Sequence, residues 1–317
     1  MRSANLDEIK SALDVPAAIE SIEAGFVALS SGAATVPPVG HIGFEAPPGE
    51  CHIKYGHIHG DAVFVIKIAT GFYENPSRGL ATGGGMMIVM SAETGEPLSL
   101  LDDSGYLTDV RTAIAGCIAA RYLAPDAVEC IGIVGAGMQA RMQLQYLRHV
   151  RDCNRVIVWA RRGERSAAYR REMADAGYDV RVADSLRDLC DSSNLIVTAT
   201  ASTAPLVRSE WVRPGTHITA MGSDTPGKQE LDPLLFARAG VCAVDSLPQC
   251  LDHGESGYAV AGGHIAEASL VELGDIIAGK AKGRSNPREI TIADLTGVAV
   301  QDIQVAKAVW SALRNWA

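Results

Sequence analysis

Residues 129–141 read Glu-Cys-Ile-Gly-Ile-Val-Gly-Ala-Gly-Met-Gln-Ala-Arg, and this stretch decides the fold. The apolar run 131–134 is typical of a buried parallel strand, and it leads into a glycine turn and a helix-compatible segment. Such a junction points backbone N–H groups and the positive end of a helix dipole at a phosphate. Gly135 permits the tight turn, Gly137 lets the backbone approach a pyrophosphate, and Ala140 lets the helix pack on the strand. The pattern predicts a dinucleotide site, with a glycine turn in another α/β domain as the alternative.

The composition fits a large α/β protein. The chain has 317 residues, of which 47% are hydrophobic and only 5% aromatic. A net charge of −9 argues against nucleic-acid binding, and no apolar run approaches the ~18 residues of a membrane span. Seven cysteines without a C-x-x-C pair indicate reduced thiols, and the N-terminus lacks an apolar signal core. We therefore expect a cytoplasmic protein that binds neither nucleic acid nor a membrane.

The order of predicted elements indicates two domains. In the second part of the chain, strands are expected at 130–134, 155–159, 179–182, 194–199, 216–221 and 239–244. Helices such as 138–149 and 164–176 lie between them, which is typical of a doubly wound parallel sheet. After Leu251 the chain reads as helical to about Gly283, followed by a short strand at 289–291.

The first part of the chain has a different pattern. It begins with a helix over 13–31 and ends with a helix over 107–123. Strand-like segments at 51–57, 62–69, 84–91 and 97–102 follow a Pro- and Gly-rich connection at 36–50 and predict a mostly antiparallel sheet. We expect the terminal helix 302–317 to return to this part. The predicted fold is thus α/β, with a Rossmann-type domain over 125–297 and a discontinuous α+β domain formed by 1–124 and 298–317.

The end of the second Rossmann strand bears on the choice of coenzyme. NAD enzymes usually place an acidic residue there, but strand 155–159 runs into Ala160-Arg161-Arg162, and no carboxylate follows until Glu164. Two arginines favour NADP, because a guanidinium pairs with phosphate oxygens. The alternative is that both are solvated at a helix start and that NAD is accepted as well.

Two later strands end in small polar residues. Val197-Thr-Ala-Thr200-Ala-Ser202 is suited to lie beneath the adenosine, and Thr219-Ala-Met221-Gly-Ser223-Asp224 ends the next strand. Ligands of such sheets bind at the carboxyl ends of the strands, so we expect Asp224 near the nicotinamide, with a loop-capping role as the alternative. The expected coenzyme contacts in this domain are Gly135, Gly137, Met138, Gln139, Ala140, Arg161, Arg162, Thr200, Ser202, Met221 and Ser223.

Further motifs extend along nearly the whole chain. They are Val65-Ile-Lys67, Thr94-Gly-Glu-Pro-Leu98, Leu107-Thr-Asp-Val-Arg111-Thr112-Ala113, Gly222-Ser-Asp224-Thr-Pro-Gly-Lys-Gln-Glu-Leu231 and Asp294-Leu-Thr296-Gly297-Val-Ala-Val-Gln-Asp302. Together with Gly135–Ala140 they resemble the ornithine cyclodeaminase/mu-crystallin family. The resemblance implies a homodimer that binds an amino acid or imine between a substrate and dimerisation domain and a Rossmann domain. It also implies hydride transfer between the substrate α-carbon and nicotinamide C4.

The resemblance also implies roles for individual residues. Lys67 and Arg111 would hold the substrate α-carboxylate, and Asp224 would serve its nitrogen. Thr112 would reach the pyrophosphate, and Thr296 would lie near the nicotinamide. The chemistry is consistent, because burial of Lys67 in an apolar strand should lower its pKa and allow acid–base catalysis. A plain salt bridge of Lys67 and Arg111 is the structural alternative.

One position departs from the family. Ornithine cyclodeaminases carry a substrate-facing Glu thirteen residues before the strand lysine, where this chain has Lys54. An ammonium there opposes the amine of ornithine, and three cations could accept two carboxylates. We therefore expect NAD(P)H-dependent reduction of a dicarboxylic imino acid, iminosuccinate to L-aspartate. The alternatives are a monocarboxylate held partly by Lys54, an ornithine cyclodeaminase, and a crystallin-like binding protein.

Histidines 52, 57 and 59 alternate on or near a predicted strand. Apart from Cys51, no acidic or cysteine residue in this segment has the spacing of a metal ligand. The sequence therefore predicts that no metal is bound.

Overall fold

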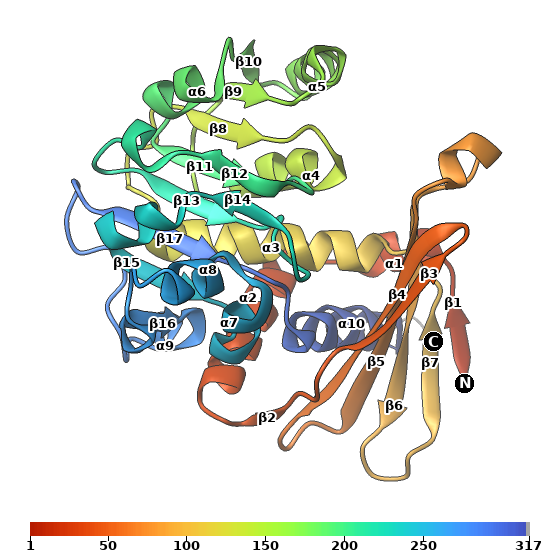
Figure 1. Ribbon diagram of the computed structural model, residues 1–317. Helices are drawn as coiled ribbons and strands as arrows, with labels where there is room; N and C mark the ends of the chain where they lie inside the picture. The colour runs from red at the N-terminus through yellow and green to blue at the C-terminus, as the bar shows by residue number, and fades with distance from the viewer. Residues whose placement is uncertain (315–317) are drawn as a thin grey trace. The chain divides into compact units, whose positions relative to one another are not determined.

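The computed structural model describes residues 1–314 and divides the chain into two compact units (Figure 1). The first unit comprises residues 1–112 and the chain from Val298 onward, and the second comprises Ala113–Gly297. Helix α3 (Tyr106–Leu123) contributes its first turns to the first unit and the rest to the second. The predicted division at residue 124 assigns this whole helix to the first domain instead.

The first unit contains a seven-stranded sheet in the order β1-β7-β6-β5-β4-β2, with β3 paired to β4. Its strands are β1 (Arg2–Ala4), β2 (Ala34–Thr35), β3 (Gly40–Glu45), β4 (Pro48–Ile58), β5 (Val63–Phe72), β6 (Gly83–Ser91) and β7 (Pro97–Leu101). Among its described strands only the β1–β7 pairing is parallel, so the prediction of a mostly antiparallel sheet is confirmed. The prediction of a connection over 36–50 is wrong, because it contains β3, an exposed strand that aligns with β4 from Gly40 to Glu45.

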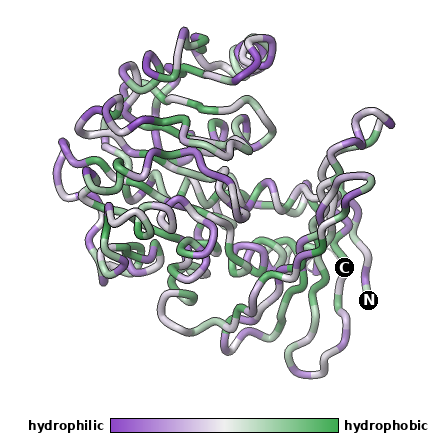
Figure 2. Tube along the Cα trace, in the orientation of Figure 1, coloured by the Kyte–Doolittle hydropathy of each residue, from purple (hydrophilic) through white to green (hydrophobic). Residues whose placement is uncertain are grey.

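The two faces of this sheet differ in burial. Along β5, β6 and β7 every buried residue is odd-numbered, and the even-numbered residues are partly exposed or exposed. The buried residues are Val63, Val65, Lys67, Met87, Val89, Ser91, Ser99 and Leu101. Figure 2 shows that these strands are largely hydrophobic along their length. Lys67 belongs to the buried set, because it follows Val63 and Val65 at the period of two.

Within residues 1–314, helices α1, α2 and α10 belong wholly to the first unit, together with a 3₁₀ turn at Asn75–Arg78. Helix α1 (Leu6–Ala12) begins with a capping box, in which Asn5 and Glu8 each accept a backbone N–H of the other. Helix α2 (Val15–Ser30) is capped by Asp14, which accepts the N–H of Ala17. Helix α10 (Ala299–Arg314) packs on α2, β4 and β5, which confirms that the terminal helix returns to this unit. Residues 315–317 of the predicted helix lie outside the described part of the chain.

The second unit is built on an eight-stranded parallel sheet in the order β10-β9-β8-β11-β13-β17-β15-β16. The strands are β8 (Ile131–Val134), β9 (Arg155–Trp159), β10 (Asp179–Val182), β11 (Leu195–Thr198), β13 (His217–Ala220), β15 (Ala239–Val244), β16 (Leu270–Glu272) and β17 (Ile290–Asp294). Strands β12 (Thr203–Val207) and β14 (Gln229–Leu231) form a separate parallel pair. This is the predicted Rossmann-type sheet.

Helices alternate with these strands. They are α4 (Met138–Leu147), α5 (Gly163–Asp175), α6 (Leu186–Ser192), α7 (Leu247–His253), α8 (Glu255–Ala261) and α9 (Leu273–Ile277), with 3₁₀ turns at Ser209–Trp211, Pro233–Arg238 and Glu267–Ser269. The prediction of continuous helix from Leu251 to about Gly283 is wrong, since β16 interrupts it and pairs with β15.

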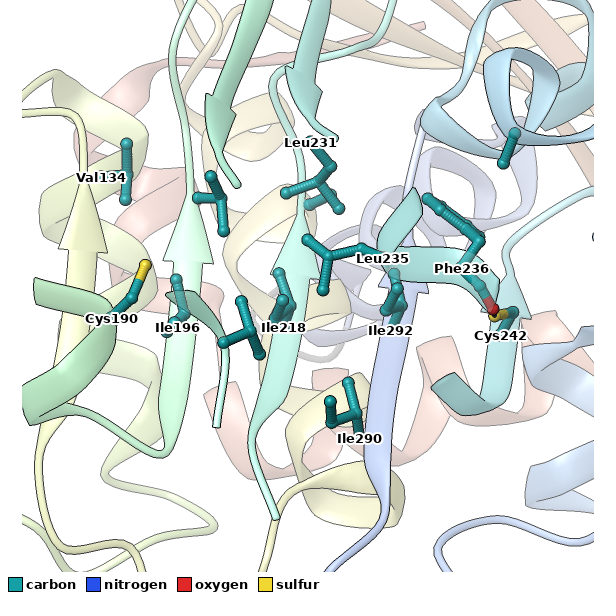
Figure 3. Close-up of a cluster of buried hydrophobic side chains, with 14 of the residues drawn as sticks. Val134, Cys190, Ile196, Ile218, Leu231, Leu235, Phe236, Cys242, Ile290 and Ile292 are labelled. Atoms are coloured by element: carbon teal, nitrogen blue, oxygen red, sulfur yellow. Dashed lines mark hydrogen bonds between the residues drawn. The ribbon is translucent and has the colours of Figure 1, made fainter. Parts of the chain in front are cut away.

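The central strands are buried on both faces, as a sheet covered by helices requires. Figure 3 shows one of the resulting clusters, where Ile196, Ile218 and Ile292 from neighbouring strands pack with Leu235 and Phe236. Among residues 1–314, none of the helices has the length and apolar character needed to cross a bilayer.

Candidate active site

The glycine turn after β8 has a backbone that only glycine adopts easily. Gly135 has φ +117°, and a Cβ at this position would lie 2.6 Å from the carbonyl oxygen of Ala199. Its N–H donates to the carbonyl of Trp159 at the end of β9. The turn is thus fixed against the ends of two neighbouring strands.

Helix α4 begins directly after this turn. Gly137 is its N-cap, contributes no capping side chain, and has no atom within 4 Å of the place where a Cβ would stand. Ala140 is fully buried, which agrees with the predicted close packing of helix on strand. Arg141 fixes the turn from the helix side, because its Nη1 donates to the carbonyls of Ala136 (2.6 Å) and Gly137 (3.0 Å). This arrangement leaves the helix start open to an anion.

A pocket of about 410 Å³ lies beside the glycine turn. Its walls include Gly135 and Gly137, the predicted Arg161 and Arg162, Thr200 and Ser202, and two residues that the sequence analysis did not select, Trp159 and Arg165. Three arginines line it, and none of its described wall residues is a carboxylate. The open turn, the small residues and the positive charge fit a dinucleotide with its phosphates.

The floor of this pocket depends on a buried carboxyl group that the sequence analysis missed. Glu230 accepts hydrogen bonds from Thr198 Oγ1 (2.6 Å), from the N–H and Oγ1 of Thr200 (2.7 and 2.6 Å) and from the N–H of Gly222 (2.8 Å). Burial raises the pKa of Glu230 above its ordinary value. Its position within the Gly222–Leu231 motif was the available signal. Glu230 therefore joins the ends of β11 and β13 below the predicted adenosine site.

Other predicted coenzyme residues lie at the ends of the same strands. Met138 is exposed and Gln139 is partly buried in the first turn of α4. Met221 follows β13, and its N–H donates to the carbonyl of Thr198. Ser223 is buried and donates to the carbonyls of Lys228 and His253.

Asp224 and Thr296 have different surroundings within the second unit. Asp224 is half exposed and forms an ion pair with Lys228 at 2.6 Å. Thr296 is buried and donates to Asp245 Oδ1 at 2.9 Å, while the neighbouring N–H of Gly297 donates to Oδ2 at 2.7 Å. The segment that contains Thr296 is thus held by Asp245.

The second set of predicted residues forms a buried charge cluster in the first unit. Lys67 Nζ lies 3.0 Å from Oδ1 and 2.9 Å from Oδ2 of Asp302, and Arg111 Nε lies 3.0 Å from Oδ1. Arg111 Nη1 also donates to Gln301 Oε1 at 2.8 Å. The two predicted cations therefore share one carboxylate on α10, which was quoted in the sequence motif but given no role.

Lys54 belongs to the same cluster. It lies directly opposite Lys67 in the antiparallel pairing of β4 and β5, so both side chains leave the same face of the sheet. Lys54 is partly buried, and its charge acts on both Lys67 and Asp302. The structure therefore adds an anion, Asp302, to the three predicted cations, whose role toward a substrate stays a prediction.

The cluster shifts the titration of its members. Burial lowers the pKa of Lys67 to about 7, against the attraction of Asp302 and with help from the charges of Arg111 and Lys54. Burial alone would raise the pKa of Asp302, but Lys67 and Arg111 hold it below its ordinary value. Lys67 can therefore gain or lose a proton near neutral pH while Asp302 remains ionised.

Two further residues frame the cluster at the start of α3. Asp103 is buried and accepts the N–H groups of Leu107 (2.6 Å) and Gly105 (3.3 Å), and burial raises its pKa. Thr112 follows Arg111 on the helix, and its Oγ1 donates to the carbonyl of Thr108 at 2.8 Å. The role of Thr112 toward a pyrophosphate stays a prediction.

The parallel sheet and the glycine turn define a Rossmann-type α/β protein. The chain belongs to the ornithine cyclodeaminase/mu-crystallin family, whose sequence profile matches residues 3–315. The resemblance inferred from the sequence motifs is therefore confirmed.

Relatives in sequence carry several descriptions. A putative dehydrogenase from Rhizobium meliloti is 42% identical over 292 residues, covering 91% of this chain and 88% of its own. An alanine dehydrogenase from Archaeoglobus fulgidus is 37% identical over 305 residues (96% and 92%). An iminosuccinate reductase from Paracoccus denitrificans is 35% identical over 306 residues (95% and 93%). The family thus includes oxidoreductases with different substrates.

Solved structures give the same picture. An archaeal alanine dehydrogenase dimer with bound NAD has a TM-score of 0.92 at 35% identity and covers 100% of this chain and 97% of its own. A Δ1-pyrroline-2-carboxylate reductase from Thermococcus litoralis with NADH and L-proline has a TM-score of 0.92 at 28% identity (100% and 98%). The Paracoccus denitrificans iminosuccinate reductase with NAD⁺ has a TM-score of 0.90 at 32% identity (100% and 97%).

Proposed function

We propose that this chain is an NAD(P)H-dependent imino-acid reductase, which in reverse is an amino-acid dehydrogenase. The observation that carries the proposal is the buried cluster of Lys67, Arg111 and Asp302 with Lys54 beside it. Cations kept in such a place by a shared carboxylate are suited to orient a small acid, and orientation is a large part of what hydride transfer needs.

The second unit is proposed to hold the coenzyme. The pyrophosphate would bind at Gly135–Ala140, and Arg161 and Arg162 would favour the 2′-phosphate of NADP, with Arg165 as a third donor from the same pocket. The relatives named above were solved with NAD or NADH. Use of NAD is therefore the alternative. When bound, the coenzyme supplies or accepts the hydride at nicotinamide C4.

Lys67 and Arg111 are proposed to hold the substrate α-carboxylate. In its charged form Lys67 would also donate a proton to the imine nitrogen, which makes the α-carbon accept hydride more readily. A pKa of about 7 suits this task, because both protonation states are then populated at neutral pH. Asp224 would stabilise the positively charged imine nitrogen. For this, its carboxylate must give up the ion pair with Lys228 and pair with the substrate nitrogen instead.

The proposed substrate is iminosuccinate, reduced to L-aspartate. Lys54 would pair with the second carboxylate, and the similarity to an iminosuccinate reductase supports this choice. The ammonium of Lys54 also disfavours ornithine, so an ornithine cyclodeaminase is a weaker candidate. A crystallin-like binding protein would have no need of Lys67, Arg111 and Asp224 together.

One observation favours a second candidate, an alanine dehydrogenase type of reaction on a monocarboxylate. Asp302 neutralises one of the three positive charges, and Asp103 lies close enough to Lys67 for their charges to interact. Less positive charge then remains for a second substrate carboxylate than the three cations alone suggest. The similarity to an alanine dehydrogenase agrees with this reading.

We further propose that two copies pair through the partly exposed face of the first unit's sheet. The even-numbered residues of β5 and β6 on this face include Ile66, Ile68, Met86 and Ile88. An apolar face of this kind is typical of an interface. The archaeal alanine dehydrogenase is described as a dimer.

Absorbance of the reduced coenzyme tests the enzymatic proposal. Oxaloacetate with ammonia, pyruvate with ammonia, and ornithine are each assayed with NADPH or NADH, and with the oxidised forms for ornithine. The proposal predicts coenzyme oxidation with oxaloacetate and ammonia. Proline formation from ornithine without net change in coenzyme would identify a cyclodeaminase, and no turnover with tight coenzyme binding would identify a binding protein.

A further inference from the structure

The hairpin of β3 and β4 gathers two histidines and a glutamate outside the charge cluster. His41 lies opposite His52 in the pairing, and Glu50 precedes His52 by two residues on β4. One ligand atom from each of the three residues lies within 4.8 Å of the others. The alternation of His52, His57 and His59 in the sequence does not indicate this combination, because His41 lies on the neighbouring strand.

The spacing of these atoms fits a metal ion. Glu50 Oε2 and His52 Nε2 are 3.3 Å apart, and the rings of His41 and His52 have centroids 4.9 Å apart. Zinc binds histidine nitrogen and carboxylate oxygen at about 2.0–2.2 Å, so two ligands of a tetrahedral site lie roughly 3.4 Å apart. The Glu50–His52 distance already has this value. Only His41, on the exposed strand β3, has to move closer.

The surroundings hold one ligand in position and place no bulky side chain opposite it. Tyr73 donates to Glu50 Oε1 at 2.7 Å, which fixes the carboxylate with its other oxygen toward His52. A hydrogen bond of this kind to a ligating carboxylate is common around bound metals. The positions opposite Glu50 on the neighbouring strands are Gly43 and Gly71, so no larger side chain competes there.

We propose that His41, Glu50 and His52 bind a divalent transition-metal ion of the zinc class. Two imidazoles and one carboxylate are a donor set that suits Zn²⁺, and three protein ligands leave a fourth position for water or another ligand. His52 and Glu50 retain 21% and 27% side-chain exposure, so an ion can enter from solvent. Glu50, His52 and Lys54 are two residues apart on β4, so their side chains leave the same face of the sheet. The site therefore lies on the same sheet face as Lys54.

Calorimetry with Zn²⁺ on the tag-free full chain tests this proposal, with Co²⁺ absorption as a second readout of coordination geometry. One ion should bind per chain, and His52→Ala and Glu50→Gln should each weaken binding at least about tenfold. Tyr73→Phe removes the hydrogen bond to Glu50 and should weaken Zn²⁺ binding by roughly tenfold or less. Circular dichroism of each variant establishes that the fold is kept.

Two matched controls come from the same hairpin region. His59 is exposed, and its Nε2 already interacts with Thr35 Oγ1 at 2.9 Å, so His59→Ala should leave Zn²⁺ binding unchanged. Cys51→Ser should also leave Zn²⁺ binding unchanged, because the side chain of Cys51 leaves the opposite face of β4. The proposal is overturned if Zn²⁺ does not bind, or if His59→Ala or Cys51→Ser weakens binding as much as His52→Ala does.

Discussion

The glycine turn of the second unit and the charge cluster of the first are specified in different ways. The turn and its helix start lie within Ile131–Leu147, and their shape follows from local backbone requirements at Gly135. The cluster joins residues from β4, β5, α3 and α10, with Lys67 and Asp302 separated by 235 positions. A site made of backbone can be recognised from a short motif. A site made of buried charges depends on long-range partners that the motif does not display.

The largest expected effect concerns the ion pairs of the cluster. Asp302→Ala leaves Lys67 and Arg111 buried without their shared carboxylate, and it should lower the free energy of unfolding by about 3–5 kcal/mol. Asp224→Ala removes the exposed pair with Lys228 and should cost at most about 1 kcal/mol. Chemical denaturation measures both. Equal losses at the two positions would remove the distinction between a buried cluster and a surface pair.

The glycine turn offers a similar comparison between two neighbouring glycines. Gly135→Ala forces a Cβ against the carbonyl of Ala199 at φ +117°, which should cost about 1–3 kcal/mol and weaken coenzyme binding about 10–100-fold. Gly137→Ala meets open space at φ −87°. It should leave the denaturation midpoint unchanged and weaken coenzyme binding alone. A loss of stability in Gly137→Ala, or none in Gly135→Ala, would contradict this account of the turn.

The titration of Lys67 gives the next effect. Lactate and malate are non-reacting acids whose carboxylates stay ionised near neutral pH. Their inhibition constants should rise toward tenfold per pH unit above about pH 7, because neutral Lys67 no longer attracts an anion. Lys67→Arg keeps its charge, and its constants should stay flat over this range. If the inhibition constants of Lys67→Arg depend on pH as they do in the natural chain, a group other than Lys67 is titrating.

The same shift affects stability with a defined sign. Unfolded Lys67 has its ordinary pKa near 10.5, whereas in the folded chain the value is about 7. Between these values the unfolded state binds more protons, so this group makes folding less favourable at pH 7 than at pH 10. Its contribution to the free energy of unfolding therefore rises with pH in that interval.

The smallest effect is expected at the coenzyme pocket. Replacing Arg161 and Arg162 with Ser should raise the Michaelis constant for NADPH roughly tenfold, because charge-assisted hydrogen bonds to a phosphate are lost. The constant for NADH should change little. If neither constant moves, the NADP preference is wrong.

The sequence predicted the central strands of the second unit well because their signals are local, whereas β12, β14 and β16 were not predicted. Strands 155–159 and 239–244 were placed at the residues where β9 and β15 lie, since buried parallel strands are short apolar runs. Strand β3 was missed because it is exposed and contains Gly40 and Gly43, so it lacks the alternation that identifies a strand. Its strand conformation depends on the hydrogen-bonded pairing with β4, which its own sequence does not indicate.

The candidate site shows the same limit. Lys67 and Arg111 were found through family motifs, but Asp302 and Glu230, which hold the site residues in place, were not given roles. Asp302 had a usable signal, because it is an acid among Val300 and Ile303 on a helix whose first turns are buried. A buried acid needs a cation partner, although the sequence alone does not say which one.

The most direct test of the account is the substrate preference before and after removal of the charge at Lys54. The ratio of kcat/KM for oxaloacetate with ammonia to that for pyruvate with ammonia is measured in the natural chain and in Lys54→Gln. We predict that the natural chain prefers oxaloacetate and that the substitution lowers the ratio about 10–100-fold, as the loss of one charged contact implies. A ratio that is the same in both proteins would contradict the role of Lys54, and a natural chain that prefers pyruvate would leave a reductase of monocarboxylic imino acids.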